Sequence, residues 1–211
     1  FDYLHHAKDY GISADNVKAD FGAVVKRSRD VAEGMSKGVQ FLMKKNKIDV
    51  IMGSAKVKPG KKVEVTGADG KVTAYGASHI IIATGARSRQ LPNLPQDGKK
   101  IIGYREAMNM PKQPASMVVV GSGAIGVEFA YFYATMGTKV TVVEFLPNIV
   151  PVEDEEVSKQ LEKSFKKAGI EVMTDASVES VDTKGDVCKV NVKTKNGNVS
   201  LDAEIVLSAV G

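Results

Sequence analysis

Apolar residues recur every three or four positions between residues 21 and 43, which is the spacing of one face of an α-helix. Asp20 precedes this run and is a suitable N-cap, because its carboxylate can accept from the free amide groups of a first helical turn. The pattern predicts a long helix from Asp20 to about Lys47. The positions that recur at this spacing are Phe21, Val24, Val25, Ser28, Val31, Met35, Val39, Leu42 and Met43.

Short apolar runs between residues 49 and 83 predict strands. Three strands are expected at about 49–53, 62–66 and 71–75. The last two are joined by Ala68-Asp69-Gly70, which is typical of a tight turn, so we expect a small antiparallel sheet. The run His79–Ala83 is nearly all apolar, which predicts a strand buried on both faces.

Prolines are concentrated in the middle of the chain, where four of the seven lie between residues 92 and 114. Each removes a backbone donor and restricts the residue before it, so we place a boundary here between two domains, 1–114 and 115–211. The pattern then changes to strand, helix and strand, which predicts an α/β fold built on a βαβ unit. These elements are expected at 117–120, about 124–136 and 139–143, with Gly137 ending the helix.

A second helix is expected in the same domain, from about Asp154 to Ala168. Gly169 follows it and favours a left-handed helix end. One face of this helix carries Val157, Leu161 and Phe165.

Strands dominate the end of the chain. Two of them, 187–194 and 199–201, flank Asn196-Gly197, which is typical of a type I′ hairpin turn. The apolar run 205–210 predicts a further buried strand. The second domain is therefore expected to be Rossmann-like, with an antiparallel strand insertion.

A glycine-rich loop follows the strand Met117–Val120 and reads Gly121-Ser122-Gly123-Ala124-Ile125-Gly126. In a dinucleotide-binding loop, Gly121 would make the tight turn, Gly123 would let the backbone touch a pyrophosphate, and Gly126 would let the helix pack on the strand. The phosphates would lie at the helix N-terminus, where free amide groups favour negative charge. The motif alone is also compatible with an ordinary strand-loop-helix turn, but the strand before it and the helix and strand after it favour dinucleotide binding.

Glu144 stands at the end of the next strand, 18 residues beyond Gly126. A carboxylate there can accept from both ribose hydroxyls of NAD and would repel the additional phosphate of NADP. The following residues 145–147 contain no Arg or Lys that could bind that phosphate. The sequence therefore favours NAD, although a solvated carboxylate at a strand end is the alternative.

The composition is that of an ordinary globular protein, with 43% hydrophobic and 26% charged residues among 211. The net charge of +4 is divided unevenly, with 20 Lys and Arg against 11 Asp and Glu in residues 1–115 and 9 against 14 in residues 116–211. This asymmetry supports two units. The basic residues are scattered and Trp is absent, so nucleic-acid binding is not expected.

Several other classes of protein are disfavoured. The chain has no apolar run of membrane-spanning length and does not begin with a secretion signal, so we expect neither a membrane protein nor an exported one. The single cysteine, Cys188, alternates with polar residues in an expected strand and is interpreted as a small core residue rather than a reactive thiol. No cluster predicts a metal site.

Glu128 lies two residues beyond Gly126, in an otherwise apolar helix start. A carboxylate there either points to water or meets a cation from another segment, and its surroundings alone do not decide between the two.

The stretch Met117–Phe145, together with Ala83-Thr84-Gly85 and Ser208–Gly211, resembles the dihydrolipoamide dehydrogenase family, the flavoprotein E3 component of 2-oxoacid dehydrogenase complexes. The resemblance covers the whole chain, is most specific at the glycine loop and is looser over residues 1–75. It implies that residues 1–114 are a partial FAD-binding domain and that 115–211 bind NAD. It also implies that Glu128 pairs with a lysine beside the flavin.

The resemblance assigns cofactor contacts residue by residue. Those to NAD would come from Gly121, Ser122, Gly123, Ala124, Ile125, Gly126, Val127, Glu128, Glu144, Val178 and Gly211. Those to FAD would come from Ala55, Thr84, Gly85 and Ala86. His5, His6 and His79 match no catalytic position of the family, so no catalytic residue is expected within the chain.

The chain also departs from the family pattern. It lacks a first FAD-binding βαβ unit, a C-x4-C redox disulfide with its lysine, and the His-Glu pair of a C-terminal interface domain. We therefore expect it to be the central fragment of a longer protein, inactive by itself. The resemblance implies that the parent is a cytoplasmic homodimer that oxidises dihydrolipoyl groups on lipoyl domains with NAD.

Two alternatives remain open from the sequence. The parent could be another pyridine nucleotide-disulfide oxidoreductase, such as glutathione reductase, mercuric reductase or a transhydrogenase, although Glu144 disfavours those that use NADP. The chain could instead be a non-catalytic NAD-binding module.

Overall fold

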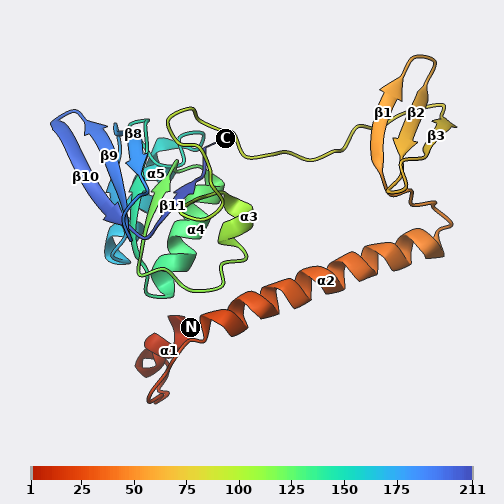
Figure 1. Cartoon of the computed structure of the whole chain (residues 1–211). Coiled ribbons are helices and arrows are strands. Elements are labelled where there is room, and N and C mark those ends of the chain that lie inside the picture. Colours follow the sequence, from red (N-terminus) through yellow and green to blue (C-terminus); the bar gives the residue numbers. More distant parts are fainter. Residues whose placement is uncertain (1, 211) are drawn as a thin grey trace. The chain divides into compact units, whose positions relative to one another are not determined.

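The computed structural model describes residues 2–210 (Figure 1). The chain forms two compact units, one of residues 28–86 and one of the residues up to Arg27 together with those from Arg87 onward. The segment 87–114 is thus part of the same compact unit as the glycine loop. The predicted boundary at residue 114 divides the chain by the cofactor that each part would bind, and compactness does not test that, so this boundary stays a prediction.

A parallel five-stranded sheet forms the centre of the larger unit, with the strand order β4-β11-β5-β6-β7. Its strands are β4 (Ile101–Ile102), β5 (Ser116–Val120), β6 (Lys139–Val143), β7 (Glu171–Met173) and β11 (Ile205–Ser208). The helices of this unit that follow them are α3 (Tyr104–Ala107), α4 (Ala124–Thr135) and α5 (Glu155–Lys167). The predicted α/β class and the βαβ unit β5-α4-β6 are confirmed.

A separate antiparallel sheet, β10-β9-β8, lies between β7 and β11 in the sequence (Figure 1). It comprises β8 (Ser177–Asp182), β9 (Cys188–Thr194) and β10 (Gly197–Ala203), which confirms the predicted insertion. The predicted turn is wrong. The two turn residues are Lys195 and Asn196, and neither has the positive φ that a type I′ turn requires, whereas Gly197 has φ +119° and pairs with Thr194.

The parallel sheet separates two apolar cores. On β5 and β11, Val119 and Leu207 belong to the core beneath the helices, and their neighbours Val118 and Val206 belong to the core beneath the antiparallel sheet. This alternation is expected of strands covered on both faces. Cys188 is fully buried in the second core, so its assignment as a small core residue is confirmed, and burial raises the pKa of its thiol, which disfavours the reactive thiolate.

Helix α5 is capped as the sequence predicted, since Asp154 Oδ1 accepts from the Glu156 amide at 2.8 Å. Phe165 is buried, but Val157 is 55% exposed, so only part of the apolar face of this helix packs into the core. The reason is the helical pitch: eight residues advance a helix by two turns and about 80°, which carries Val157 away from the core.

Helix α2 (Phe21–Lys45) follows the short helices α1 (Asp2–His5) and η1 (Ala7–Tyr10). Its residues 21–27 belong to the larger unit and its residues 28–45 to the smaller one. Its predicted cap is confirmed, because Asp20 Oδ1 accepts from the Ala23 amide at 3.0 Å. Phe21 is buried against the rings of Phe132 and Tyr133. The later apolar positions of this helix are exposed, including Met35 and Leu42. No described helix is both long and apolar enough to cross a membrane.

The smaller unit contains the antiparallel sheet β1-β2-β3. Its strands are β1 (Ser54–Lys58), β2 (Lys62–Thr66) and β3 (Val72–Gly76), and Asp69 Oδ1 accepts from the Lys71 amide in the predicted turn. The prediction of a strand at 49–53 is wrong, because the first strand of this sheet begins at Ser54. Ser54 already pairs with Thr66 at the end of β2, so the residues before it have no partner strand.

The predicted strand at 79–83 is not formed. No described strand pairs with this segment, and Ile81 and Ile82 are 90% and 73% exposed. An extended apolar segment becomes a buried strand only when neighbouring strands satisfy its backbone groups, and the described residues supply none here.

Tyr133 connects α4 to α3 inside the helix-side core. Its hydroxyl donates to the Ala107 carbonyl oxygen at 2.6 Å, and its side chain is fully buried. Burial raises the pKa of the Tyr133 phenol from 10.0 to about 12. In the unfolded chain this phenol ionises near pH 10, whereas the folded state keeps it neutral to about pH 12. The contribution of Tyr133 to the free energy of unfolding is therefore complete below pH 10 and is lost as the pH rises to about 12.

Tyr133→Phe tests this assignment. At pH 8 the variant should be about 1 kcal/mol less stable than the unmutated chain, because the Ala107 carbonyl loses its donor. Between pH 10 and 12 the variant should lose less stability than the unmutated chain, since it has no phenol to ionise. Urea unfolding at several pH values measures both effects, and parallel losses in the two proteins would contradict the assignment.

Candidate functional site

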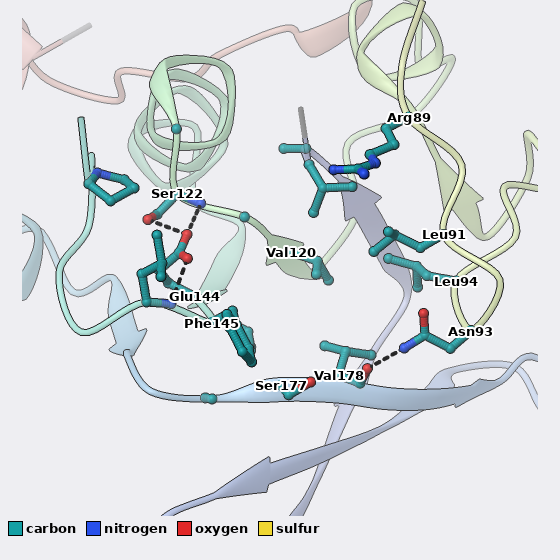
Figure 2. A pocket seen from close by; sticks show the side chains of 18 of the residues that line it. Arg89, Leu91, Asn93, Leu94, Val120, Ser122, Glu144, Phe145, Ser177 and Val178 are labelled. Carbon is teal, nitrogen blue, oxygen red and sulfur yellow. Dashed lines mark hydrogen bonds between the residues drawn. The ribbon is translucent and has the colours of Figure 1, made fainter.

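A cavity of about 680 Å³ opens at the carboxyl ends of β5, β6 and β11 (Figure 2). Val120, Val143 and Val210 line it from these ends. The chain runs from β5 to β6 on one side, while β11 lies on the other side of β5, so the cavity occupies the point where the strand order reverses. This is the usual ligand position in open α/β sheets.

The glycine loop forms one wall of the cavity. At two of its three glycines, neighbouring backbone atoms leave no room for a side chain. Gly121 has φ +96°, and a Cβ added there would lie 2.9 Å from the Ala209 carbonyl oxygen. A Cβ on Gly126 would lie 2.1 Å from the Gly121 carbonyl oxygen, which confirms the close packing predicted for this position. Gly123 differs, because a Cβ on it would meet no atom within 4 Å. The backbone at Gly123 therefore faces open space.

Gly123 is also the N-cap of α4, with φ −65° and ψ 178°. The first turn of any α-helix leaves its amide groups without partners in the helix, and the helix dipole adds partial positive charge there. Open space at a glycine that begins a helix is the arrangement that admits a phosphate group.

Glu144 lies beside this loop at the end of β6 and is only 7% exposed (Figure 2). Its Oε2 atom accepts from the Ser122 amide at 2.8 Å and from the Ser122 hydroxyl at 2.7 Å. Its Oε1 atom accepts from the Leu146 amide at 2.8 Å. Glu144 is therefore not a solvated carboxylate, and three of its roughly four acceptor directions are occupied. One direction remains, so a second ribose bond would require one of these donors to move.

The opposite wall was missed by the sequence analysis. Arg89, Leu91, Asn93 and Leu94 line the cavity, although their segment carries no recognised motif (Figure 2). Asn93 Nδ2 donates to the Val178 carbonyl oxygen at 2.6 Å, and this bond ties the segment to β8. Only this long-range contact reveals the wall, and no local signal in the sequence could have predicted it.

The structure brings together part of the predicted dinucleotide set. Gly121, Ser122, Gly123, Glu144 and Val178 line the cavity. Five other predicted contacts follow along α4 without lining it, and their roles stay predictions; these are Ala124, Ile125, Gly126, Val127 and Glu128. Glu128 is exposed, and its pairing with a flavin-side lysine also stays a prediction. Gly211 lies outside the described residues.

The residues predicted to contact FAD lie in the smaller unit. Ala55 is in β1, and Thr84, Gly85 and Ala86 belong to no helix or strand. All four are exposed, so they do not by themselves enclose a flavin. Within residues 2–210, no group of three or more His, Cys, Asp or Glu side chains is arranged to hold a metal ion.

Residues 3–211 match the family model described as pyridine nucleotide-disulphide oxidoreductase. The chain belongs to this family. Two similar relatives are the dihydrolipoyl dehydrogenases of Chlorobaculum tepidum and Rhizobium etli, which are 45% and 44% identical to it over the whole chain. The match covers 45% and 47% of these relatives, so the chain spans about half of their length.

A solved structure supports the fold of this pyridine nucleotide-disulphide oxidoreductase. The crystal structure of LpdA from Mycobacterium tuberculosis matches the whole chain with a TM-score of 0.89 and 26% sequence identity. The match covers 46% of the LpdA chain, which agrees with the share of the sequence relatives.

Proposed function

We propose that the larger unit binds NAD in the cavity between the glycine loop and the 89–94 segment. The observation that carries this proposal is the buried Glu144 beside the open backbone of Gly123, because the two supply a ribose acceptor and a phosphate position in one cavity. The amide groups at the start of α4 would hold the pyrophosphate, and Val178 would contact the adenosine side. NAD, when bound, supplies the hydride acceptor of the reaction.

We further propose that the whole protein is a dihydrolipoyl dehydrogenase. The family match and the two relatives support this proposal. Such an enzyme oxidises protein-bound dihydrolipoyl groups with NAD, using FAD and a redox disulfide, and its partners would be the lipoyl domains of 2-oxoacid dehydrogenase complexes. We propose a cytoplasmic homodimer. FAD would be contacted only in that whole protein, by Ala55, Thr84, Gly85 and Ala86.

Another disulfide oxidoreductase of the same family is the second candidate. Glu144 argues against the members that use NADP, because its carboxylate would face the additional phosphate. A non-catalytic NAD-binding module would have the same cavity, so upstream sequence distinguishes it: a Cys pair at C-x4-C spacing favours the oxidoreductase.

Fluorescence titration of NADH with the unmutated chain tests the NAD site. We expect enhanced NADH emission on binding, and competition by ADP-ribose, which carries the ribose and pyrophosphate that the cavity is proposed to hold. No change in emission, or no competition by ADP-ribose, would refute the proposed site.

The chain alone should not oxidise dihydrolipoamide. It contains one cysteine, the buried Cys188, and a redox disulfide needs two. We therefore expect NAD reduction by dihydrolipoamide to equal that of a heat-denatured control, with or without added FAD. Turnover above that control would show that chemistry is carried by residues of this chain.

A further inference from the structure

Ser122 lies between the first two glycines of the loop, and its side chain is 0% exposed although the residue lines the cavity. Both of its donor groups reach the same atom, Glu144 Oε2, through the amide at 2.8 Å and the hydroxyl at 2.7 Å (Figure 2). Hydrogen bonds to a carboxylate are stronger than those between neutral groups. The hydroxyl therefore supports Glu144 and is not presented to a ligand.

Ser122 also contacts Val150, which lies at the far end of the segment that follows β6. The Ser122 carbonyl oxygen accepts from the Val150 amide at 2.9 Å. Val150 is buried and has φ +41°, a strained conformation for a β-branched residue, which the surrounding contacts must maintain. The segment 144–150 is thus fixed to Ser122 at both of its ends, and the Glu144 carboxylate cannot turn without breaking a hydrogen bond.

The arrangement leaves a defined acceptor for a ligand. Ser122 occupies both directions of Glu144 Oε2, and the Leu146 amide occupies one direction of Oε1. The remaining direction of Oε1 can accept from a ribose hydroxyl. A phosphate at the same ribose position would instead bring two negative charges together, and a fixed carboxylate cannot move away from it.

We propose that Ser122 is a positioning residue for dinucleotide selectivity, because its hydroxyl holds the Glu144 carboxylate against the glycine loop. The proposal rests on the proposed NAD site and gives a structural cause for its preference for NAD over NADP. Without the hydroxyl, Glu144 keeps its two backbone donors, one on each oxygen, but has lost one of the three hydrogen bonds that oppose a turn of the carboxylate. Turning away from a ribose phosphate then costs less free energy. Ser122→Ala should lower the ratio of the NADPH Kd to the NADH Kd by about tenfold.

Calorimetric titration of the full chain with NADH and with NADPH tests this role. The proteins compared are the unmutated chain, Ser122→Ala, Glu144→Ala and the double variant. In the Glu144→Ala background, the loss of the Ser122 hydroxyl should leave the Kd ratio unchanged, since no carboxylate remains to be positioned. Ser200→Ala removes an exposed hydroxyl from β10 and should behave as the unmutated chain.

An unchanged Kd ratio in Ser122→Ala would overturn the proposal, and so would an equal fall of the ratio in both backgrounds. Circular dichroism shows whether each variant is folded; if Ser122→Ala is not, Ser122→Gly also removes the hydroxyl and should give the same ratio. A chain that binds no NADH would refute the proposed NAD site and this role with it. NADH binding with unaltered selectivity in the variants would refute only the role of Ser122.

Discussion

Gly123→Val should weaken NADH binding by about 100-fold or more while leaving the protein folded. The valine side chain would occupy the open space at the start of α4, where the proposed pyrophosphate approaches the backbone. Several charge-assisted amide contacts would be lost together, and each is worth about 1.5–3 kcal/mol. The fold should persist, because Gly123 has an ordinary negative φ and an added Cβ meets no atom within 4 Å.

Gly76→Val is the matched control for this variant. Gly76 lies at the end of β3 in the smaller unit, has no positive φ, and also has open space where a Cβ would stand. The control should bind NADH as the unmutated chain does. NADH fluorescence enhancement that survives in Gly123→Val would place the ligand elsewhere.

Glu144→Ala should weaken NADH binding by roughly 10- to 100-fold, because a charge-assisted ribose contact is lost. NADPH binding should change far less or improve, since the repulsive carboxylate is removed as well. The variant should also lose about 1–3 kcal/mol of unfolding free energy, because the donors of Ser122 and Leu146 lose their buried partner.

Titration of both cofactors and urea unfolding measure these effects separately. Asp202→Ala removes an exposed carboxylate from β10 and serves as the control for the loss of one negative charge. If Glu144→Ala weakened NADH and NADPH binding equally, the carboxylate would have a structural role only.

The sequence predicted those parts of the site that depend on local pattern. The loop 121–126, helix α4 and strand β6 lie where the spacing of glycines and apolar residues placed them, because each is determined by its own backbone preferences and neighbours. Glu144 also lies beside the loop, as its spacing from Gly126 along the chain led us to expect, while its contact with a ribose stays a prediction.

The remainder depends on contacts between distant segments, which periodicity does not report. The wall formed by residues 89–94 is held by the bond from Asn93 to Val178, 85 positions away in the chain. The apolar run 79–83 has the pattern of a buried strand, but a strand also needs paired neighbours. The hydrogen bonds that Ser122 and Leu146 donate to the Glu144 carboxylate likewise form only in the folded loop. Residue type alone therefore could not predict that one acceptor direction of this carboxylate remains free.

The most direct test of the NAD site is a calorimetric titration of the unmutated chain with NADH and, separately, with NADPH. A carboxylate that accepts from the ribose of one cofactor and repels the phosphate of the other predicts that NADH binds at least about tenfold more tightly. Equal affinity for the two cofactors, or tighter binding of NADPH, would contradict the assignment of Glu144 and the glycine loop as an NAD site.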